Sequence, residues 1–486
     1  MKNRKSPRTN GHRFWVILIL ALWLFIAPTV GLAQRSQINQ SSSTETRPTV
    51  STPNGLVTDE FQLVRPTSQT KPVTSASSAQ FSTDIPKTDI QVPLEPTVGG
   101  RVGVLIETLD GKTVRDVASD ELYNPASNVK LLTALVALKN FGHDYRFTTA
   151  VWTNGTFDAA TGTINGDLII SGRDPSFHYE HAVELAQELN KQGIRTVTGN
   201  LIVPYGFTMN FDWSALRSGE KLYDTLDSTR RPSVAASAWY QQRVSMGDTA
   251  SLQTTPSVAV MGAVYVDSVP AQARVILMHK SPKLIDILKV LLCYSNNFMA
   301  ERIGESIGGP GGIKRTLVDK FGLNENEVFL ASASGLGTNR VSPRAMMKVL
   351  RALRMQLALS GHQFSDIMPV AGIDPGTLEK RFTATNSRGS VIGKTGTLGN
   401  TDGGVSSLAG LMRTASGETL MFVIFNMRGS VSRFRNYQDS LITFVQNERG
   451  GPAPFAYVPQ SFAVRLSDTK LDATNKLGDE YEDPNQ

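Results

Sequence analysis

The chain has 486 residues, of which 40% are hydrophobic, and this is enough for a substantial core and for more than one ordinary domain. The formal net charge is +6, but residues 1–33 hold five basic and no acidic side chains, which leaves 44 basic against 43 acidic residues. This near-neutral remainder gives no reason to expect nucleic acid or an acidic membrane surface as a partner. The single cysteine, Cys293, excludes an intrachain disulfide, and the six histidines are too scattered to predict a metal site.

The N-terminus has the order of an export signal. Basic residues precede the apolar run from Phe14 to Ala27, and the small-residue ending Gly31-Leu32-Ala33 follows. This order predicts a secretory signal peptide over residues 1–33, with cleavage after Ala33. An uncleaved membrane anchor is the alternative. Both interpretations export the rest of the chain to the periplasm or cell envelope, and neither predicts any other contact with a membrane.

Two segments are predicted to lie outside the folded part. Residues 34–96 are rich in Ser, Thr, Gln and Pro and have few large apolar residues, which is typical of a flexible tether. Residues 451–486 end in the acidic, polar run from Gly478 to Asp483. We expect this tail to be disordered.

The two ends of the folded part are predicted to build one sheet. A hairpin is expected near the start, with strands from Arg101 to Leu109 and from Lys112 to Val117 joined at Asp110-Gly111. Three later strands and a last helix are expected at Ser390 to Thr397, Val405 to Arg413, Leu420 to Met427 and Phe434 to Asn447. These strands would form a sheet with helices on its faces.

The middle of the chain mixes strand and helix patterns. Short strands are expected at Phe147 to Trp152, Leu168 to Ile170 and Val197 to Val203, with a β-leaning stretch from Tyr240 to Val275 and a helix from His181 to Lys191. Helices are then expected at Lys283 to Leu292, at Phe298 to Ile307 with a break at Gly308 to Gly312, and from Ser342-Pro343 to about Leu357. The predicted fold class is α/β (α+β), with residues 97–146 and 277–450 forming the main domain and residues 147–276 forming a smaller, β-rich inserted domain.

The stretch from Pro125 to Leu135 sets a serine one helical turn before a lysine. Residues three apart lie on the same face of a helix, so the Ser127 hydroxyl and the Lys130 amine can meet. The helix is expected to end around Gly142, and its residues from Leu131 to Leu138 are apolar on nearly all sides, which indicates burial on every face. A helix N-terminus also favours a developing alkoxide or oxyanion. This arrangement is what a covalent hydrolase needs.

Two further motifs strengthen this interpretation, because Ser-x-x-Lys also occurs at Ser68, Ser218 and Ser467 and is not decisive alone. Ser295-Asn296-Asn297 lies between two predicted helices, and Lys394-Thr395-Gly396 lies on a predicted strand. Ser-x-x-Lys, Ser-x-Asn and Lys-Thr-Gly in this order are the signature of penicillin-binding proteins and class A β-lactamases.

The residue types make chemical sense together. A serine hydroxyl needs a base, and Lys130 can serve if burial or a second cation such as Lys394 lowers its pKa. The Ser295 hydroxyl can pass a proton toward a leaving amine, while the Asn297 amide offers a donor and an acceptor to a substrate peptide group.

The strand motif suits the other end of a substrate. Lys394 and the Thr395 hydroxyl are suited to a terminal carboxylate, and Gly396 keeps the strand edge clear for a ligand. The main-chain N–H groups of Ser127 and Thr397 can form an oxyanion hole.

Further short motifs, in the same order as in a known family, extend the similarity over roughly residues 100–430. Asn124 to Leu131 matches a known first motif almost letter for letter, and it is followed by Gly166-Asp167-Leu168, Asp174-Pro175, Ser334-Gly335-Leu336, Pro369-Val370-Ala371-Gly372, Gly376-Thr377-Leu378 and Ser407-Leu408-Ala409-Gly410. With these motifs the chain resembles the D-alanyl-D-alanine carboxypeptidase/endopeptidase family of class C penicillin-binding proteins.

The resemblance implies a β-lactamase/transpeptidase-like fold, with a five-stranded antiparallel sheet between helices. It implies an exported serine DD-carboxypeptidase that acts on D-Ala-D-Ala termini or cross-links of peptidoglycan, and it leaves open whether the enzyme is also a DD-endopeptidase. It further implies that the enzyme is acylated by β-lactams and needs no cofactor. The implied roles are Ser127 as nucleophile, Lys130 as general base, Ser295 as proton relay, and Asn297, Lys394 and Thr395 as substrate-binding residues.

The chain departs from the family pattern in two ways. The first two motifs lie 168 residues apart (295 − 127), which is short for members with two inserted domains. Thr338 and Pro204 also stand where many members have charges that hold the amino-acid end of a diaminopimelate side chain, and Arg340 is a candidate substitute for one of them.

Two alternatives stay open. A non-catalytic cell-wall-binding or scaffold protein that keeps the fold would explain the two lost charges and the long tether. A β-lactamase is the other, although the sequence shows no additional general base for fast deacylation.

Overall fold

The computed structural model describes residues 94–473. The predicted signal peptide and nearly all of the predicted tether therefore lie outside the described residues, as does the end of the tail. Within residues 94–473, no helix is both long enough and apolar enough to cross a membrane.

The main sheet is antiparallel and has five strands in the order β14-β15-β16-β1-β2. Its strands are β1 (Arg101–Thr108), β2 (Thr113–Val117), β14 (Val391–Leu398), β15 (Val405–Arg413) and β16 (Thr419–Met427). The predicted sheet, assembled from an early hairpin and three late strands, is confirmed. Strand β14, which carries the Lys-Thr-Gly motif, lies at one edge of the sheet.

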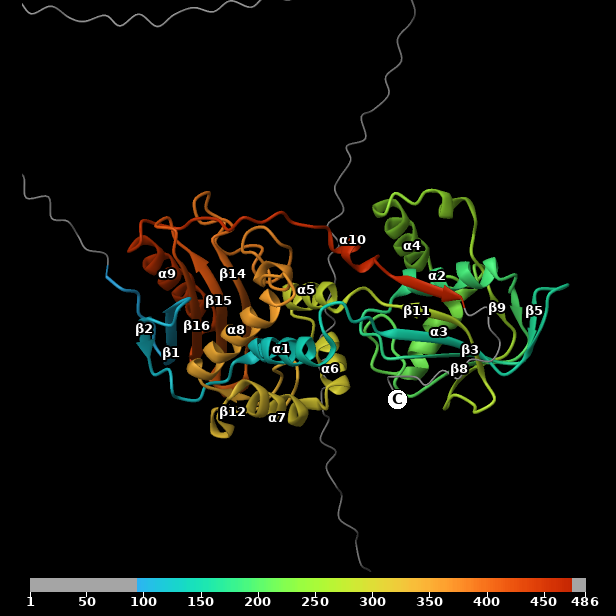
Figure 1. The fold of residues 1–486 in the computed structure, drawn as a ribbon, viewed down its shortest axis with the longest axis horizontal. Coiled ribbons are helices and arrows are strands. Elements are labelled where there is room, and N and C mark those ends of the chain that lie inside the picture. Colours follow the sequence, from blue (N-terminus) through green and yellow to red (C-terminus); the bar gives the residue numbers. More distant parts are fainter. Residues whose placement is uncertain (1–93, 474–486) are drawn as a thin grey trace, which may run out of the picture. The chain divides into compact units, whose positions relative to one another are not determined.

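Helices cover both faces of this sheet, and the strand period of two residues decides which side chains meet them. Val104 and Ile106 face α9 (Val431–Asn447) and share a buried cluster with its Leu441. Leu105 points to the opposite face, where its cluster includes α1 (Val129–Phe141) and α8 (Pro343–Ala358). Figure 1 shows the sheet with α9 on one side and with α1 and α8 on the other.

Helix α1 is buried up to its last turn, as its apolar sequence predicts. All residues from Val129 to Leu138 are buried, and the helix ends at the C-cap Gly142, which has a φ of +83°. Such a φ is costly for any residue with a Cβ atom, so a glycine fits here. Helix α8 begins after the predicted N-cap, because the Ser342 hydroxyl accepts a hydrogen bond from the main chain of Ala345.

The remaining helices of this part lie between β11 (Arg274–Lys280) and α8 in the sequence. They are α5 (Leu284–Tyr294), α6 (Asn297–Ser306) and α7 (Gly309–Phe321), and a two-stranded ribbon of β12 (Val328–Phe329) and β13 (Arg340–Val341) follows. The predicted helix break at Gly308 to Gly312 is wrong in its length, because the break in the structure is shorter. Gly308 caps α7 in a left-handed conformation, and the helix then runs through the remaining glycines, with Pro310 in its first turn.

The segment between the first two motifs forms two further sheets, one of which gains a strand from the C-terminal tail. One has six strands in the order β10-β8-β6-β3-β11-β17, and the other has four in the order β4-β5-β7-β9. The strands are β3 (Thr148–Thr153), β4 (Thr156–Asp158), β5 (Thr163–Asn165), β6 (Leu168–Gly172), β7 (Thr196–Val197), β8 (Leu201–Val203), β9 (Ala259–Val260), β10 (Val264–Val266), β11 (Arg274–Lys280) and β17 (Lys470–Ala473).

Helices α2 (Tyr179–Lys191), α3 (Ala215–Leu226) and α4 (Ser233–Ser245) belong to the same segment. The β-leaning prediction for Tyr240 to Val275 is wrong at its start, because Tyr240 lies in α4. Trp239 of this helix is buried and the guanidinium of Arg243 stacks on its ring, so packing overrides the strand propensity of the aromatic residues. The predicted domain boundaries stay predictions.

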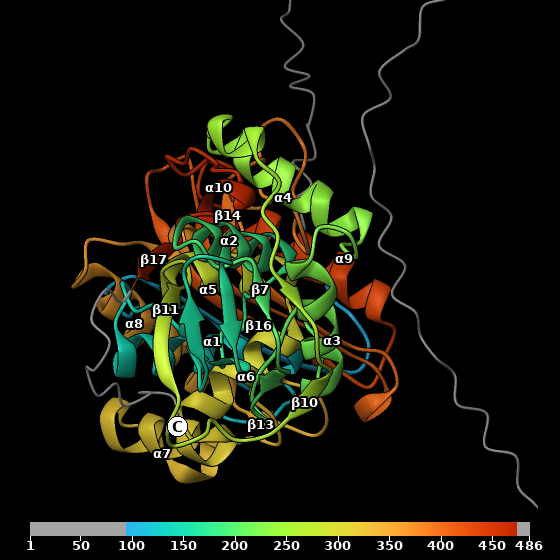
Figure 2. The same cartoon turned by 90° about the vertical axis from the view of Figure 1, so that its right-hand side faces the viewer.

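The expected disorder of the C-terminal tail is wrong for residues 451–473. The Phe455 N–H donates to the Gly389 carbonyl beside the main sheet, and helix α10 (Phe462–Leu466) contacts α5 through an ion pair between Arg465 and Asp286. Strand β17 then pairs antiparallel with β11, as Figure 2 shows. Main-chain pairing and a few anchoring side chains order a segment whose composition is polar.

Candidate active site

Ser127 lies in a short 3-10 turn, Ala126–Asn128, directly before α1. Polar side chains fasten this turn to its surroundings. The Asn128 amide donates to Ser407 Oγ at 2.8 Å, and the Ser407 hydroxyl donates to the Pro125 carbonyl at 2.6 Å. Ala126 has a φ of +47°, a strained value for a residue with a side chain. The turn is therefore held in one conformation that presents Ser127.

Two glycines let other segments approach this turn closely. A Cβ atom on Gly335 would overlap the carbonyl oxygen of Ala126 and lie 3.0 Å from the Ser127 nitrogen. A Cβ atom on Gly396 would overlap Ser407 Oγ and lie 2.7 Å from the Pro125 carbonyl oxygen. The need for glycine at position 396 thus arises from packing inside the protein, which differs from our expectation that it clears the strand edge for a ligand.

Lys130 is completely buried beside Ser127. Its Nζ atom lies 3.2 Å from Ser127 Oγ, 2.7 Å from Asn297 Oδ1 and 2.6 Å from the Ser334 carbonyl oxygen. Burial lowers the pKa of Lys130 to about 7, against an opposing effect of Glu301. A neutral amine has two N–H donors and one lone pair, so donation to Asn297 and Ser334 leaves the lone pair for the Ser127 hydroxyl.

Glu301 supports the site and does not belong to any of the sequence motifs. It lies on α6 one turn after Asn297, and its carboxylate accepts hydrogen bonds from the main-chain N–H groups of Ala333 and Ser334. Through these bonds it holds the loop that supplies the carbonyl partner of Lys130. The i, i+4 spacing between Asn297 and Glu301 on a predicted helix was the signal that could have found it.

Ser295 and Lys394 meet on the other side of the site. Ser295 is the C-cap of α5 in a left-handed conformation, and Lys394 Nζ donates to its hydroxyl oxygen at 2.8 Å and to the Thr395 carbonyl at 2.6 Å. Burial, and then the proximity of Lys130, lowers the pKa of Lys394 well below its usual value. Lys394 is 0% exposed, and the two residues to which its amine donates line the cavity described below.

The end of α5 is fixed by the Gly376-Thr377 loop. The Thr377 N–H donates to the Cys293 carbonyl at 3.0 Å, and a Cβ atom on Gly376 would overlap the same oxygen. Cys293 itself is a buried core residue, and burial raises the pKa of its thiol to about 12.

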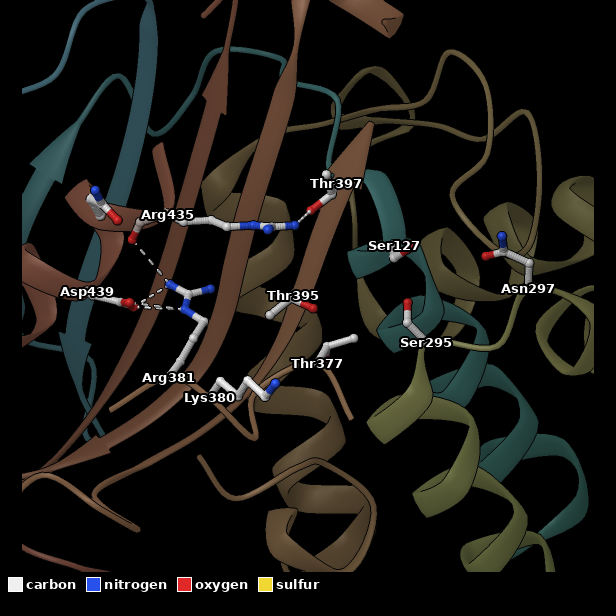
Figure 3. Close-up of a pocket in the computed structure, with 11 residues that line it drawn as sticks. Ser127, Ser295, Asn297, Thr377, Lys380, Arg381, Thr395, Thr397, Arg435 and Asp439 are labelled. Carbon is white, nitrogen blue, oxygen red and sulfur yellow. Dashed lines mark hydrogen bonds and ion pairs between the residues drawn. The ribbon is translucent and has the colours of Figure 1, made fainter. Parts of the chain in front are cut away.

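A cavity of about 700 Å³ opens between the motifs, within the usual range for ligand sites. Ser127, Ser295, Asn297, Thr395 and Thr397 line it, and so do residues that sequence reasoning did not select: Thr377, Lys380, Arg381, Arg435, Asn436 and Asp439. Figure 3 shows Thr395 and Thr397 on β14 between Ser127 and Ser295 on one side and Arg435 on the other. Lys130, Lys394 and Gly396 are not among the lining residues.

The positions linked to diaminopimelate recognition do not line the cavity. Neither Pro204 nor Thr338 is among its lining residues, and Arg340, the candidate substitute, forms a two-point ion pair with Asp402 at 2.8 and 2.9 Å. Burial would raise the pKa of the Asp402 carboxyl, but its hydrogen bonds with Arg340 and Asn124 outweigh that effect and lower it. Arg340 is thus engaged within the protein.

Comparisons with known proteins agree with the motifs. The model of the D-Ala-D-Ala carboxypeptidase 3 (S13) family matches residues 91–213 and 248–448, so the gap in the match takes in α3 and α4. A D-alanyl-D-alanine carboxypeptidase of Actinomadura sp. (strain R39) is 27% identical, over 78% of this chain and 84% of the relative.

Solved structures show the shared fold. The penicillin G-acylated predatory endopeptidase Bd3459 of Bdellovibrio bacteriovorus, in complex with immunity protein Bd3460, is 22% identical with a TM-score of 0.62, over 76% of this chain and 100% of that chain. Penicillin binding protein 4 (dacB) of Haemophilus influenzae, complexed with a β-lactam, is 24% identical with a TM-score of 0.53, over 72% of this chain and 96% of that chain. The predicted fold class is confirmed. The chain belongs to the D-Ala-D-Ala carboxypeptidase 3 (S13) family.

Proposed function

We propose that this serine-type D-Ala-D-Ala carboxypeptidase works through an acyl-enzyme on Ser127, with Lys130 as general base and Ser295 as proton relay. The observation that carries the proposal is the placement of Lys130, which is buried, has a pKa near 7 and lies 3.2 Å from the Ser127 hydroxyl. A base with a pKa near the operating pH is the most effective. The comparisons give no support to the non-catalytic scaffold interpretation.

Acylation begins when neutral Lys130 takes the hydroxyl proton of Ser127 and the oxygen attacks the carbonyl carbon of the D-Ala-D-Ala bond. The main-chain N–H groups of Ser127 and Thr397 are the proposed donors to the oxyanion. When the C–N bond breaks, the leaving nitrogen takes a proton from the Ser295 hydroxyl, which regains one from Lys130. The proton lost by Ser127 therefore ends on the released D-Ala.

Deacylation follows the same path with water in place of the amine. Lys130 accepts a proton from water, the hydroxide attacks the ester carbon, and Ser127 leaves with its proton restored. The products are the shortened peptide with a new carboxylate and the free enzyme. The Asn297 amide and the Thr395 and Thr397 hydroxyls, which line the cavity, are the proposed substrate-binding groups. Lys394 acts through Ser295, and Gly396 through the packing of the turn.

The finer assignments rest on the relatives. One relative is a predatory endopeptidase acylated by penicillin G, and another holds a β-lactam. We infer that this protein is also acylated by β-lactams and that cross-linked peptidoglycan peptides are a second substrate. From the predicted export signal we infer that the protein lies in the cell envelope. Residues 97–146 with 277–450 are the proposed catalytic domain, with residues 147–276 inserted.

Incubation with diacetyl-L-Lys-D-Ala-D-Ala tests the activity. Free D-Ala should accumulate with wild-type protein and not with Ser127→Ala, and digestion of isolated peptidoglycan, with products identified by mass, separates loss of D-Ala from cleavage of cross-links. Muropeptide binding without D-Ala release over hours would contradict the proposal and support a scaffold. Rapid nitrocefin turnover without a stoichiometric burst would instead support a β-lactamase.

A further inference from the structure

The strand motif supplies a lysine whose amine is buried in the protein. Lys394 is fully buried, and its Nζ atom contacts the Ser295 hydroxyl and the Thr395 carbonyl. We expected this residue to hold the carboxylate of a substrate. In the structure its amine is buried and donates to two residues that line the cavity, so an exposed cation at the cavity surface is the second candidate for this role.

Arg435 supplies such a cation from α9. Its guanidinium reaches over the main sheet, and Nη2 donates to Thr397 Oγ1 at 3.0 Å, as Figure 3 shows. Arg435 lines the cavity, is exposed, and forms no ion pair within residues 94–473. Its neighbour Arg381 is different, because its guanidinium forms an ion pair with Asp439, in which Arg381 Nε lies 2.9 Å from Asp439 Oδ1. Arg435 therefore keeps its charge available to a ligand.

The contact with Thr397 also sets the direction of the threonine hydroxyl. A hydroxyl has one hydrogen to donate, and because Thr397 Oγ1 accepts from Arg435, that hydrogen is free to point at a ligand. Thr395 and Thr397 are two residues apart on β14, so their side chains lie on the same face of the strand. Two hydroxyl donors and a guanidinium then converge on one side of the cavity, which is the chemistry that binds a carboxylate.

We propose that Arg435 binds the carboxylate of the amino acid released on cleavage. The inference rests on the proposed function, which places the scissile carbonyl between Ser127 and Thr397. That carboxylate is attached to the carbon next to the scissile nitrogen, so it must lie beside Thr397 when the carbonyl is in place. The resulting specificity is for peptides that end in a free carboxylate next to the cleaved bond.

A pair of substrates tests this assignment. Diacetyl-L-Lys-D-Ala-D-Ala and its C-terminal carboxamide are compared by the ratio of their kcat/KM values, with D-Ala or its amide measured as product. The ratio is formed within one protein sample, so it does not depend on how much of a variant is correctly folded. Removal of a charge-assisted hydrogen bond lowers binding by about 10- to 100-fold. We therefore expect Arg435→Ala and Arg435→Gln to lower the ratio by about this factor.

Arg433→Ala is the matched control. Arg433 is an exposed arginine on the same helix and does not line the cavity, so its variant should keep the wild-type ratio. A wild-type enzyme that cleaves acid and amide equally would overturn the inference, and so would Arg435 variants that lose both activities in proportion. If Lys380→Ala lowers the ratio of acid to amide hydrolysis and Arg435→Ala does not, the residue that binds the carboxylate is Lys380. If the wild type releases nothing from either peptide, the proposed function is wrong, and the inference about Arg435 is wrong as well.

Discussion

The amine of Lys130 lies 3.2 Å from the hydroxyl oxygen of Ser127 and has no exposure to solvent. Because burial lowers the pKa of Lys130 to about 7, a large fraction of this amine is neutral at neutral pH, and only the neutral form can accept the serine proton. We predict that the second-order rate of acylation by penicillin rises with pH through about 7 and levels off above it. Below that midpoint the rate falls about tenfold per pH unit. Stopped-flow measurement between pH 5 and 9 checks this, and a flat profile would contradict it.

Glu301 opposes the effect of burial on Lys130. Its negative charge raises the pKa of Lys130, so replacement by a neutral isostere should lower that pKa further. We predict that, in Glu301→Gln, the fall of the acylation rate on the acid side of the pH profile (the acid limb) moves to lower pH. Glu305→Gln is the control, because Glu305 is exposed on the same helix and pairs with Arg302. An acid limb that stays in place or moves upward in Glu301→Gln would rule out this role for the charge.

The close approach of Gly335 to the nucleophile turn gives a prediction with a matched control. Gly335 has a φ of +88°, and a Cβ atom there would overlap the Ala126 carbonyl oxygen. Gly361 has a φ of +73°, and a Cβ atom there would meet nothing within 4 Å. Both alanine variants carry the backbone strain of about 1 kcal/mol, but only Gly335→Ala should displace Ser127.

We expect Gly335→Ala to lose penicillin acylation by about 100-fold or more, since small misplacements of reacting groups have effects of this order. Gly361→Ala should acylate at the wild-type rate and lose stability alone. Equal rates in the two variants would show that the turn does not depend on Gly335.

The C-terminal segment is anchored by a buried charge cluster that supports α5. Lys289 Nζ donates to Asp374 Oδ2 at 2.6 Å, and the Tyr457 hydroxyl donates to Asp374 Oδ1 at 2.7 Å. The side chains of Lys289 and Asp374 are 0% and 1% exposed. Removal of one partner leaves an uncompensated buried charge, so Asp374→Ala should lower the free energy of unfolding by about 3–5 kcal/mol.

Tyr457→Phe removes one hydrogen bond to a charged group and should cost about 1.5–3 kcal/mol in denaturant unfolding. Tyr205→Phe is the control. Tyr205 is 82% exposed, and its variant should change stability by less than about 0.5 kcal/mol. If Tyr457→Phe unfolds at the wild-type midpoint, the segment from residue 451 onward does not stabilise the protein through this contact.

Local patterns in the sequence predicted the parts of the fold and site that depend on local spacing. The helix pattern placed Ser127 beside Lys130, and the strand pattern placed Lys394 and Thr395 on β14. Arg435 comes from α9, 38 residues after Thr397, and nothing in its own helix indicates that it reaches across the sheet. Such a contact depends on tertiary packing, which periodicity does not encode.

Two wrong predictions have physical reasons of the same kind. The tail was expected to be disordered because it is polar, yet pairing of β17 with β11 uses main-chain groups that any residue has. The sequence also predicts a β-leaning stretch from Tyr240, but burial of Trp239 and the ion pair between Arg243 and Glu184 stabilise a helix there.

The assignment of Ser127 as nucleophile is tested most directly by mapping the site of acylation. Wild-type protein and Ser127→Ala are treated with penicillin G, quenched with acid, digested and analysed by mass spectrometry. We predict one penicilloyl group per molecule of wild type, located on the peptide that contains Ser127, and none on the variant. A penicilloyl group on Ser295 or any other residue of the wild type, or equal labelling of Ser127→Ala, would contradict the assignment.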